Sequence, residues 1–593
     1  MGSTLTMKDN KALQRKTKIL CTLGPATDEK DILRKLFING MNVARLNFSH
    51  GNHEEHLKRV EHFKKIRDEL GMPVGLMLDT RGPEIRIKQF ENKEVTLIEG
   101  STFTFTTRDV AGTDTMVSVT YAGFPGVVHR GDTLLLDDGL IGMKVTGTDD
   151  TEVTCEVIHG GVLSNNKKIN IPGAANNLPF ITEKDRDDII FGIRNDFDFI
   201  AASFVRNSND IKDLREILRK NSGEGIKIIS KIEIREGVEN IDDIIRVSDG
   251  IMIARGDMGV EIPFEELPSI QKSIIRKCYG AGKTVITATQ MLDSMIRNPR
   301  PTRAEITDVA NAIYDGTSAI MLSGETSVGK YPIDSILTMS KIAVETEYDI
   351  DYVKRFNDAP VSISRNVTNA VSRAACETAH ILGASAIVCV TKSGHTAHMV
   401  SKHHPACPIL AVTTSKKVYN QLSLDWGVFP DITERKDSTD EVFQQAVVRA
   451  SESKLVKNGD LIVITGGMIA DVSGTTNTIK VHIVGDILLE GKGITNTRAS
   501  GQVSVIGKPE EVRGFNAGEI MVIRENTDEI LAVMKNAAAI VTEEDADSQT
   551  AVVGKALGIP VVAGAHAATE ILKSGTVVTV DGRTGRVYSG LKE

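Results

Sequence analysis

The chain has 593 residues, of which 41% are hydrophobic and only 4% aromatic, so we expect several domains with aliphatic cores. A formal net charge of −9 argues against general nucleic-acid binding, and any anion site must be a local concentration of Arg and Lys. No apolar run approaches the roughly 18 residues of a membrane helix, so we expect no membrane span. The six cysteines form no CxxC pair, and the polar N-terminus lacks an apolar signal core, which favours a cytoplasmic protein with reduced thiols.

Eight short apolar runs that alternate with helical segments predict parallel strands buried on both faces. The runs are Thr17–Leu23, Asn42–Phe48, Val74–Asp79, Phe199–Phe204, Lys227–Glu233, Gly250–Asp257, Thr284–Thr289 and Ser318–Glu325. Eight such strands indicate an α/β fold of the TIM (β/α)8 type, in which function gathers at the carboxyl ends of the strands. Polar and charged residues are concentrated at those ends here, and this bias favours an enzyme.

Three further segments interrupt or follow the barrel. Between the third and fourth strands, short alternating stretches rich in β-branched residues are typical of an all-β domain, which we expect to act as a lid over the barrel mouth. Two α/β units are predicted to follow, from the runs Ala386–Thr391, Pro408–Val412 and Asp460–Thr465 and, after the weakly patterned stretch Gly491–Gly514, from Glu519–Arg524, Ala538–Thr542, Pro560–Ala563 and Val577–Val580. The predicted boundaries are 1–14 for an N-terminal extension, 15–83 and 180–350 for the barrel, 84–179 for the inserted β-barrel lid, 351–485 for the second domain and 486–593 for the last.

Glu233 and Asp257 come from the ends of consecutive strands. Because adjacent strands lie ~5 Å apart, the two carboxylates can share one divalent cation, for which Mg²⁺ or Mn²⁺ is the best match. Two acidic strand ends alone would favour a structural explanation. Lys231 lies two residues before Glu233 and so on the same face, where its charge can stabilise a transferred phosphoryl group. Together the three residues favour a functional site.

A second group of polar residues follows the second and third strands. Arg45, Asn47 and Ser49 alternate and can all point into the barrel mouth. Four oxygen-bearing residues there can surround a monovalent cation: Asn47, Ser49, Asp79 and Thr80. On sequence alone, a polar rim that hydrogen-bonds loops remains the preferred alternative. Fixed positive charge beside the site, as an anionic substrate requires, comes from Arg45, Arg81 and Arg86.

Thr289 and Ser323 end the seventh and eighth strands. Their hydroxyl groups either cap the following helices or, in a site that protonates an enolate, order a proton-carrying water. The spacing does not decide between these roles.

Six segments, in this order, resemble blocks of the pyruvate kinase family. They are Asn42–His50 (NVARLNFSH), Leu78–Arg86 (LDTRGPEIR), Lys231–Glu233 (KIE), Ala254–Gly259 (ARGDMG), Ala288–Leu292 (ATQML) and Met321–Thr326 (MLSGET). The resemblance covers about residues 15–485 and implies the transfer of the phosphoryl group of phosphoenolpyruvate to ADP, which gives pyruvate and ATP in the last step of glycolysis. It also implies a cytoplasmic homotetramer. An aldolase or lyase of the pyruvate-handling barrels fits the lid and the Arg45 block less well, and a sensor that has lost activity fits less well because every expected catalytic position is filled.

The resemblance assigns roles to individual residues. The implied catalytic residues are Lys231, Arg45, Thr289 and Ser323. The substrate would contact Arg45, Lys231, Ala254, Arg255, Gly256, Asp257 and Thr289. Mg²⁺ would be bound by Glu233 and Asp257, and K⁺ by Asn47, Ser49, Asp79 and Thr80, and a Glu at position 84 accompanies K⁺ dependence in the family. The nucleotide would contact Thr22, Pro25, Asn47, His50, Arg86 and Lys167. The family commonly has Lys where this chain has Arg81.

The loop after the strand at Ala386–Thr391 is a candidate phosphate site. Backbone N–H groups and hydroxyls at such a junction bind phosphate, although an ordinary connection is equally compatible with the pattern. The resemblance implies that a phosphorylated metabolite, an allosteric effector, binds this loop: Thr391, Lys392, Ser393, Gly394, His395 and Thr396. The companion loop would be Thr465–Asn477.

The last hundred residues resemble the swivelling phosphohistidine domain of phosphoenolpyruvate-utilising enzymes, which some bacterial pyruvate kinases carry. The resemblance rests on Asp547–Gly554 (DSQTAVVG) and Gly558–Gly564 (GIPVVAG). Gln549 stands where that family has its phosphorylated histidine. An amide cannot accept a phosphoryl group as an imidazole does, so we expect a structural or regulatory domain.

Overall fold

The computed structural model describes residues 15–173, 178–359, 366–436, 438–457, 459–467, 476–485 and 487–591. The predicted N-terminal extension, 1–14, lies outside the described residues. The chain divides into two compact units, one running up to Asp351 with Ser415–Pro430 added, the other comprising Tyr352–Thr414 and the residues from Asp431 onward. Within the described ranges, no helix is both long and apolar enough to cross a membrane.

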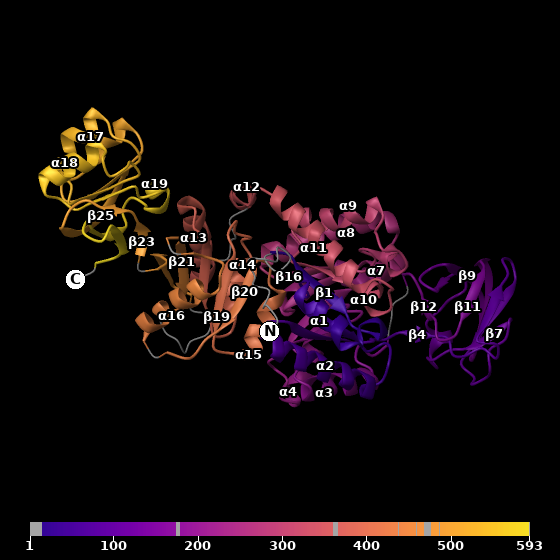
Figure 1. Cartoon of the computed structure of the whole chain (residues 1–593). Coiled ribbons are helices and arrows are strands. Elements are labelled where there is room, and N and C mark those ends of the chain that lie inside the picture. Colours follow the sequence, from indigo (N-terminus) through magenta and orange to yellow (C-terminus); the bar gives the residue numbers. More distant parts are fainter. Residues whose placement is uncertain are drawn as a thin grey trace. The chain divides into compact units, whose positions relative to one another are not determined.

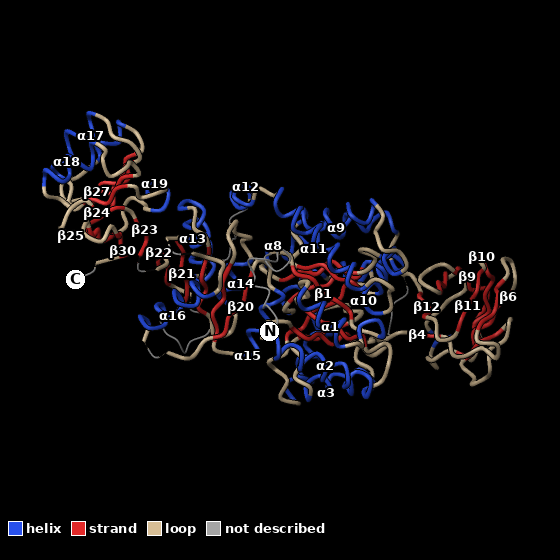
Figure 2. The backbone as a smooth tube through the Cα atoms, in the orientation of Figure 1, coloured by secondary structure: helices blue, strands red, loops and turns tan. Residues whose placement is uncertain are grey.

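Eight strands of the first unit close into the predicted barrel, in the order β1-β17-β16-β15-β14-β13-β3-β2, with helices around it (Figures 1 and 2). The strands are β1 (Lys18–Thr22), β2 (Val43–Asn47), β3 (Gly75–Asp79), β13 (Phe199–Ala202), β14 (Lys227–Ile232), β15 (Gly250–Ala254), β16 (Thr284–Ala288) and β17 (Ala319–Leu322). The surrounding helices are α1 (Lys30–Ile38), α2 (His53–Leu70), α3 (Glu183–Arg194), α4 (Ser208–Lys220), α5 (Arg235–Glu239), α6 (Ile241–Val247), α7 (Arg255–Glu261), α8 (Leu267–Ala281), α9 (Arg303–Asp315), α10 (Gly324–Ser327) and α11 (Pro332–Asp349).

Alternation along each strand divides the barrel core into two layers. Leu20 and Met252 belong to the cluster inside the barrel, whereas their neighbours Ile19 and Ile251 belong to the larger cluster between strands and helices. Successive side chains of a strand point to opposite faces, so a run that is apolar throughout fills both layers. Each strand lies within its predicted run, and β2, β3 and β14 extend into the polar residues at the ends of their runs.

The inserted lid is all-β, as predicted. Its main sheet has the order β4-β12-β8-β9-β10-β6-β7, and β11 pairs with β5. These strands are β4 (Ile85–Arg86), β5 (Glu94–Leu97), β6 (Thr102–Thr106), β7 (Met116–Ser118), β8 (Thr133–Leu136), β9 (Ile141–Thr148), β10 (Glu152–His159), β11 (Gly161–Ser164) and β12 (Lys168–Asn170).

One carboxylate joins the two chain segments that connect the lid to the barrel. Thr182 caps α3, and Asp185 completes a capping box with it. The other oxygen of Asp185, Oδ1, accepts hydrogen bonds of 3.1 Å each from the backbone N–H groups of Arg81 and Gly82. The N-cap of α3 therefore fixes the outgoing segment beside the returning one.

The segment Ser415–Pro430 lies in the second domain by the sequence-based boundaries, but it packs against the barrel. It contains α15 (Lys416–Gln421) and the short helix η6 (Leu422–Leu424). Leu424 joins the cluster inside the barrel, and Gln421 Nε2 donates to the carbonyl oxygens of Asp198 and Gly225 at 3.1 and 2.7 Å. Both carbonyls precede barrel strands, so the segment closes the amino-terminal end of the barrel.

Two further sheets form the second unit. The first has the order β20-β19-β18-β21-β22, with strands β18 (Ala386–Val390), β19 (Ile409–Thr413), β20 (Val428–Ile432), β21 (Leu461–Gly466) and β22 (Thr478–Ile483) and helices α12 (Tyr352–Asp358), α13 (Val367–Leu382), α14 (His395–Ser401) and α16 (Thr439–Glu452). The second has the order β23-β30-β29-β25-β26-β27-β28-β24. Its strands are β23 (Ile487–Glu490), β24 (Lys492–Gly493), β25 (Arg498–Ile506), β26 (Ile520–Ile523), β27 (Ala539–Thr542), β28 (Val561–Ala563), β29 (Val577–Asp581) and β30 (Arg586–Ser589), and its helices are α17 (Asp528–Val533), α18 (Gln549–Leu557) and α19 (Ala568–Ile571).

The stretch Gly491–Gly514, expected to be weakly patterned, contains the central strand β25. The amino-terminal half of β25 is small, polar and partly exposed, and Val503 and Ile506 are its buried residues. Its pairing with β29 and β26, which are distant in sequence, defines it as a strand.

Lys18, on β1, is buried at the closed end of the barrel, where its Nζ donates to the Val428 carbonyl at 2.6 Å. Burial, and then the charge of Arg15, lowers the pKa of Lys18 from 10.5 to about 7. Between these two values the unfolded chain holds a proton that the folded chain has lost, so stability rises with pH through this window. The charged form destabilises the fold at lower pH.

We therefore expect Lys18→Met to flatten the rise in stability from pH 7 to about 10, by up to about 1.4 kcal/mol per pH unit. Urea unfolding across this range would measure the difference from the wild type. Lys30→Met, which removes an exposed lysine, should leave the pH profile unchanged. Parallel pH profiles for Lys18→Met and the wild type would contradict the expectation.

Candidate active site

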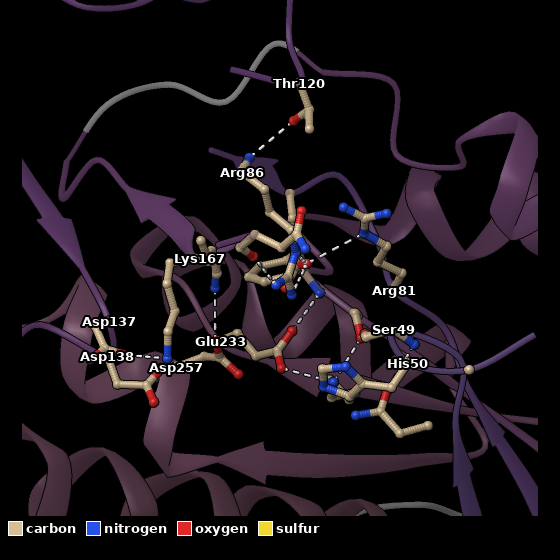
Figure 3. A pocket seen from close by; sticks show the side chains of 18 of the residues that line it. Ser49, His50, Arg81, Arg86, Thr120, Asp137, Asp138, Lys167, Glu233 and Asp257 are labelled. Carbon is tan, nitrogen blue, oxygen red and sulfur yellow. Dashed lines mark hydrogen bonds and ion pairs between the residues drawn. The ribbon is translucent and has the colours of Figure 1, made fainter. Parts of the chain in front are cut away.

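A cavity of about 940 Å³ lies at the carboxyl ends of the barrel strands and is lined by both barrel and lid (Figure 3). Predicted site residues that line it are Arg45, Asn47, Ser49, His50, Arg81, Arg86, Lys167, Lys231, Glu233 and Asp257. Further lining residues include Glu84, Asp137, Lys168, Ser203 and Phe204. The barrel thus brings one part of the predicted strand-end residues together, and the lid adds a second set. Other predicted site residues do not line the cavity: Asp79, Thr80, Ala254, Arg255, Gly256 and Thr289.

The Lys231 side chain is the centre of a buried charge network. Its Nζ lies 3.0 Å from Asp79 Oδ1 and 2.9 Å from Glu233 Oε1, and it donates to Ser203 Oγ at 2.7 Å. Arg45 Nε contacts the other oxygen of Asp79 at 2.5 Å. Burial alone would lower the pKa of Lys231, but Asp79 and Glu233 raise it, so this residue stays charged. Arg45 and Lys231 lower the pKa of Asp79 against the effect of burial.

Glu233 and Asp257 differ in surroundings although they share the site. The Glu233 side chain is 1% exposed and that of Asp257 37%. Burial raises the pKa of Glu233; Lys231 opposes this and Asp257 adds to it. The pKa of Asp257 is lowered despite burial, because Lys168 and Lys231 favour its charged form. A cation beside both carboxylates would relieve the cost of keeping Glu233 ionised.

The two carboxylates fit a divalent cation that shares its coordination with substrate. No cluster of three or more His, Cys, Asp or Glu suitable for a metal occurs in the part of the chain that the structure describes. Two protein carboxylates leave the remaining positions to substrate oxygens and water, which is the usual arrangement for Mg²⁺ at phosphate-binding sites.

Positive φ angles occur at and beside this site. Phe204, Thr289 and Gln290 have φ angles of 56°, 71° and 54°, which is uncommon for such residues and frequent at functional sites. In this conformation the Phe204 N–H donates to Glu233 Oε2 at 2.7 Å. Thr289 Oγ1 accepts from the Gly256 N–H at 2.7 Å and donates to the Ala288 carbonyl at 2.5 Å.

The side chain of Arg255 contacts Asp308 and the end of β16. Its Nη1 and Nη2 atoms donate to Asp308 at 2.8 and 2.7 Å, and Nη2 also donates to the Thr289 carbonyl at 2.9 Å. The turn Ala254–Gly256, at the start of α7, is therefore held against the end of β16.

The four residues expected to bind K⁺ lie at the ends of two neighbouring strands. Asn47 ends β2 opposite Asp79, which ends β3, and Ser49 and Thr80 follow these strands. Asn47 Oδ1 accepts from the Ser49 N–H at 3.0 Å. Thr80 Oγ1 accepts from the Ser203 N–H at 3.1 Å. These contacts fix the local geometry of the group.

The residues expected on the nucleotide side separate into two groups. Arg86 and Lys167 belong to the lid, where Arg86 pairs with Glu84 at 2.7 Å and Lys167 pairs with Asp137. His50 belongs to the barrel, and burial, followed by the charge of Arg86, lowers its pKa. Thr22 and Pro25 do not line the cavity. Thr22 Oγ1 accepts from Arg45 Nη1 at 2.9 Å and so supports a residue that does.

Ser323 also lies outside the cavity lining. Its Oγ is buried, with no hydrogen-bond partner within the described residues, although buried polar atoms are rarely left unsatisfied. Its N–H donates to Glu325 Oε2 at 2.7 Å. A water molecule beside this hydroxyl would satisfy it.

The predicted effector loop belongs to the second unit. Gly394, with φ 84°, precedes α14, which begins at His395. Thr396 Oγ1 lies 2.7 Å from Thr476 Oγ1, so the loop contacts the carboxyl-terminal end of its expected companion. Most of that companion, residues 468–475, lies outside the described residues.

Sequence reasoning missed the roles of Ser203, Phe204 and Lys168. Ser203 ends a predicted strand, so its contact with Lys231 could have been anticipated from position alone. The positive φ of Phe204 leaves no sequence signal, because Gly and Asn are the usual residues there. Lys168 follows Lys167 directly, and the sequence cannot tell which of two adjacent lysines reaches the barrel.

Comparisons with known proteins match most of the chain. The family models for the pyruvate kinase barrel domain, the pyruvate kinase alpha/beta domain and the mobile domain of PEP-utilising enzymes match residues 14–336, 369–482 and 515–585. Pyruvate kinases from Bacillus licheniformis and Geobacillus stearothermophilus are each 48% identical, over 97% and 98% of this chain and 99% of theirs. The crystal structure of a pyruvate kinase from Cryptosporidium parvum is 39% identical, with a TM-score of 0.75, over 82% of this chain and all of that one. The chain therefore belongs to the pyruvate kinase family.

Proposed function

We propose that this enzyme transfers the phosphoryl group of phosphoenolpyruvate to ADP at the cavity between barrel and lid. The observation that carries the proposal is the Lys231 ammonium, which lies 2.9 Å from Glu233 at the end of β14. The neighbouring strand β15 leads directly into α7, which carries Asp257. A pyruvate-formation assay with and without ADP tests it. Pyruvate formed only with ADP supports the transferase, whereas an ADP-independent lyase or an inactive sensor would contradict it.

Glu233 and Asp257 would hold a divalent cation, Mg²⁺ or Mn²⁺, which when bound supplies positive charge to the phosphoryl oxygens. Arg45 and Lys231 would stabilise the negative charge of the same phosphoryl group. Asp79 holds the guanidinium and the ammonium group in place before substrate binds. Such preorganisation avoids a reorientation during the reaction. Ala254, Arg255, Gly256 and Thr289 would hold the substrate carboxylate through the start of α7.

The enolate that remains after phosphoryl transfer needs a proton. Thr289 lies at the end of β16 next to the proposed carboxylate site, and the Ser323 hydroxyl is buried without a protein partner in the described part of the chain. We infer that these hydroxyls order a water molecule that carries the proton, because neither has a pKa suited to direct acid catalysis. On the opposite side, Asn47, His50, Arg86 and Lys167, with Thr22 and Pro25 at the periphery, would contact ADP.

The final domain would take no phosphoryl group. Gln549 begins α18, whose N-cap is Ser548. Glu544 Oε2 accepts from the adjacent Thr550 hydroxyl, at 2.5 Å. A carboxylate beside the former phosphohistidine position would repel a phosphoryl group, so both the acceptor and its electrostatic surroundings are altered. We also propose a cytoplasmic location and a homotetramer, for which the family membership is the sole support.

Glu233→Gln should lower kcat by at least about 10²-fold, because it removes a charge from the proposed metal site and keeps an acceptor for the Phe204 N–H. Steady-state assays at saturating Mg²⁺ and Mn²⁺ measure the effect. Glu239→Gln, which changes an exposed glutamate at the end of α5, is the matched control and should retain wild-type rates. Undiminished activity of Glu233→Gln, or of the wild type in excess chelator, would overturn the metal assignment.

Activity should also depend on K⁺. The reason is the oxygen-rich group of Asn47, Ser49, Asp79 and Thr80, in which Asp79 is already shared by Arg45 and Lys231. Assays in potassium and tetramethylammonium chloride at equal ionic strength separate a specific ion from general screening. The rate should fall in tetramethylammonium and recover as K⁺ is added back. Equal rates in both salts would mean that these residues form only a polar rim.

A phosphorylated metabolite, either a sugar monophosphate, a sugar bisphosphate or AMP, should activate the enzyme through Lys392–Thr396. Activation requires that the effector bind the active state more tightly, which lowers the KM for phosphoenolpyruvate. Lys392→Glu reverses an exposed charge of the loop and should abolish this shift without changing the basal rate. Lys457→Glu, also exposed in the same unit, is the control. An unchanged response of Lys392→Glu to all three classes would place the effector site elsewhere.

A further inference from the structure

Lys168 reaches from the lid to a proposed metal ligand in the barrel. It belongs to β12, and its Nζ donates to Asp257 Oδ1 at 2.7 Å. The same ammonium lies 4.3 Å from the centre of the Phe204 ring, whose residue donates its N–H to Glu233. The Lys168 side chain is 15% exposed. Lys168 thus contacts Asp257 directly, and it also contacts Phe204, the residue whose N–H binds Glu233.

A second contact shows that this part of the lid is fitted to the barrel. Asn170, two residues along β12, donates through Nδ2 to Glu261 Oε1 at 2.6 Å. Asp257 and Glu261 lie near the two ends of α7. Lys168 and Asn170 point the same way because they alternate along a strand. The adjacent Lys167 pairs instead with Asp137 inside the lid. Lys167 therefore contacts the lid, whereas Lys168 contacts the barrel.

The positive charge of Lys168 affects metal binding, because it balances the charges of the site. Arg45 and Lys231 supply two positive charges against the three carboxylates Asp79, Glu233 and Asp257. Lys168 completes the balance at three against three. A divalent cation on Asp257 must either displace the ammonium or remain beside it with excess positive charge, and both are unfavourable. A bound phosphate ester would neutralise the excess.

We propose that Lys168 is a counter-ion that competes with the divalent cation for Asp257 and thereby makes tight metal binding depend on the anionic substrate. The inference rests on the proposed function, since it requires Asp257 to be a metal ligand. It makes Lys168 a positioning residue that links lid, metal and phosphate ester through one carboxylate. The reciprocity of coupled binding then requires that the metal strengthen the binding of phosphoenolpyruvate by the same factor.

Calorimetric titration of the full-length protein with Mn²⁺, without substrate and then with phosphoenolpyruvate but no ADP, tests the proposal. Without substrate, Lys168→Met should bind Mn²⁺ at least about fivefold more tightly than the wild type, and phosphoenolpyruvate should enhance its affinity less. Lys168→Arg retains the charge and should behave as the wild type does. Lys88→Met is the matched control, because Lys88 also pairs with a carboxylate, Asp109 at 2.8 Å, but within the lid.

The outcomes separate this inference from the function on which it rests. If Glu233→Gln binds Mn²⁺ as the wild type does, the proposed metal site is wrong. If Glu233→Gln loses binding but Lys168→Met binds no more tightly than the wild type, the metal site stands and the role of Lys168 is overturned. Tight binding by both Lys168→Met and Lys168→Arg would also overturn it, because the charge would then not be the cause.

Discussion

The buried ion pairs of Lys231 are the interaction on which the site depends. Asp79 and Glu233 are each 0% exposed, and carboxylates in such surroundings stay ionised only when a positive charge lies beside them. The Lys231 ammonium pairs with both carboxylates, and Arg45 pairs with the other oxygen of Asp79. The arrangement requires three strand ends to meet within hydrogen-bonding distance. A closed parallel barrel provides this meeting point, and an open sheet would separate the residues.

The barrel supplies residues at rigid strand ends, whereas the lid supplies charged side chains that do not belong to the barrel strands. The connection between them is short and held by Asp185, which caps α3 and binds the backbone of Arg81 and Gly82. Because this single carboxylate ties both connecting segments, the start of β4 is positioned relative to the end of β3. The lid residues Arg86, Lys167 and Lys168 line the cavity together with the barrel residues.

The sequence predicts those features that rest on local periodicity. Runs apolar on both faces identified all eight barrel strands, and the rule that parallel strands share one functional end brought Lys231, Glu233 and Asp257 together. Features that depend on contacts between residues distant in sequence were not predicted. Ser415–Pro430 closes the barrel through Leu424 and Gln421, but its neighbours in sequence belong to another sheet. Strand β25 is defined by partners far along the chain, and the positive φ of Phe204 is imposed by the fold against the preference of the residue.

The electrostatics of the cavity explain how an acidic protein can bind a strongly anionic substrate. The cavity lining includes six cationic residues, Arg45, Arg81, Arg86, Lys167, Lys168 and Lys231, and five anionic ones, Glu84, Asp137, Asp138, Glu233 and Asp257. The chain as a whole carries a net charge of −9, whereas the cavity is close to neutral once Asp79, which pairs with Arg45 and Lys231, is counted. Most of its cations are nevertheless paired with carboxylates, which limits the attraction for stray anions. In the proposed function, a divalent cation on Glu233 and Asp257 would add positive charge at these two carboxylates, and the phosphate ester would be attracted to the point at which Lys231 and Arg45 are already in place.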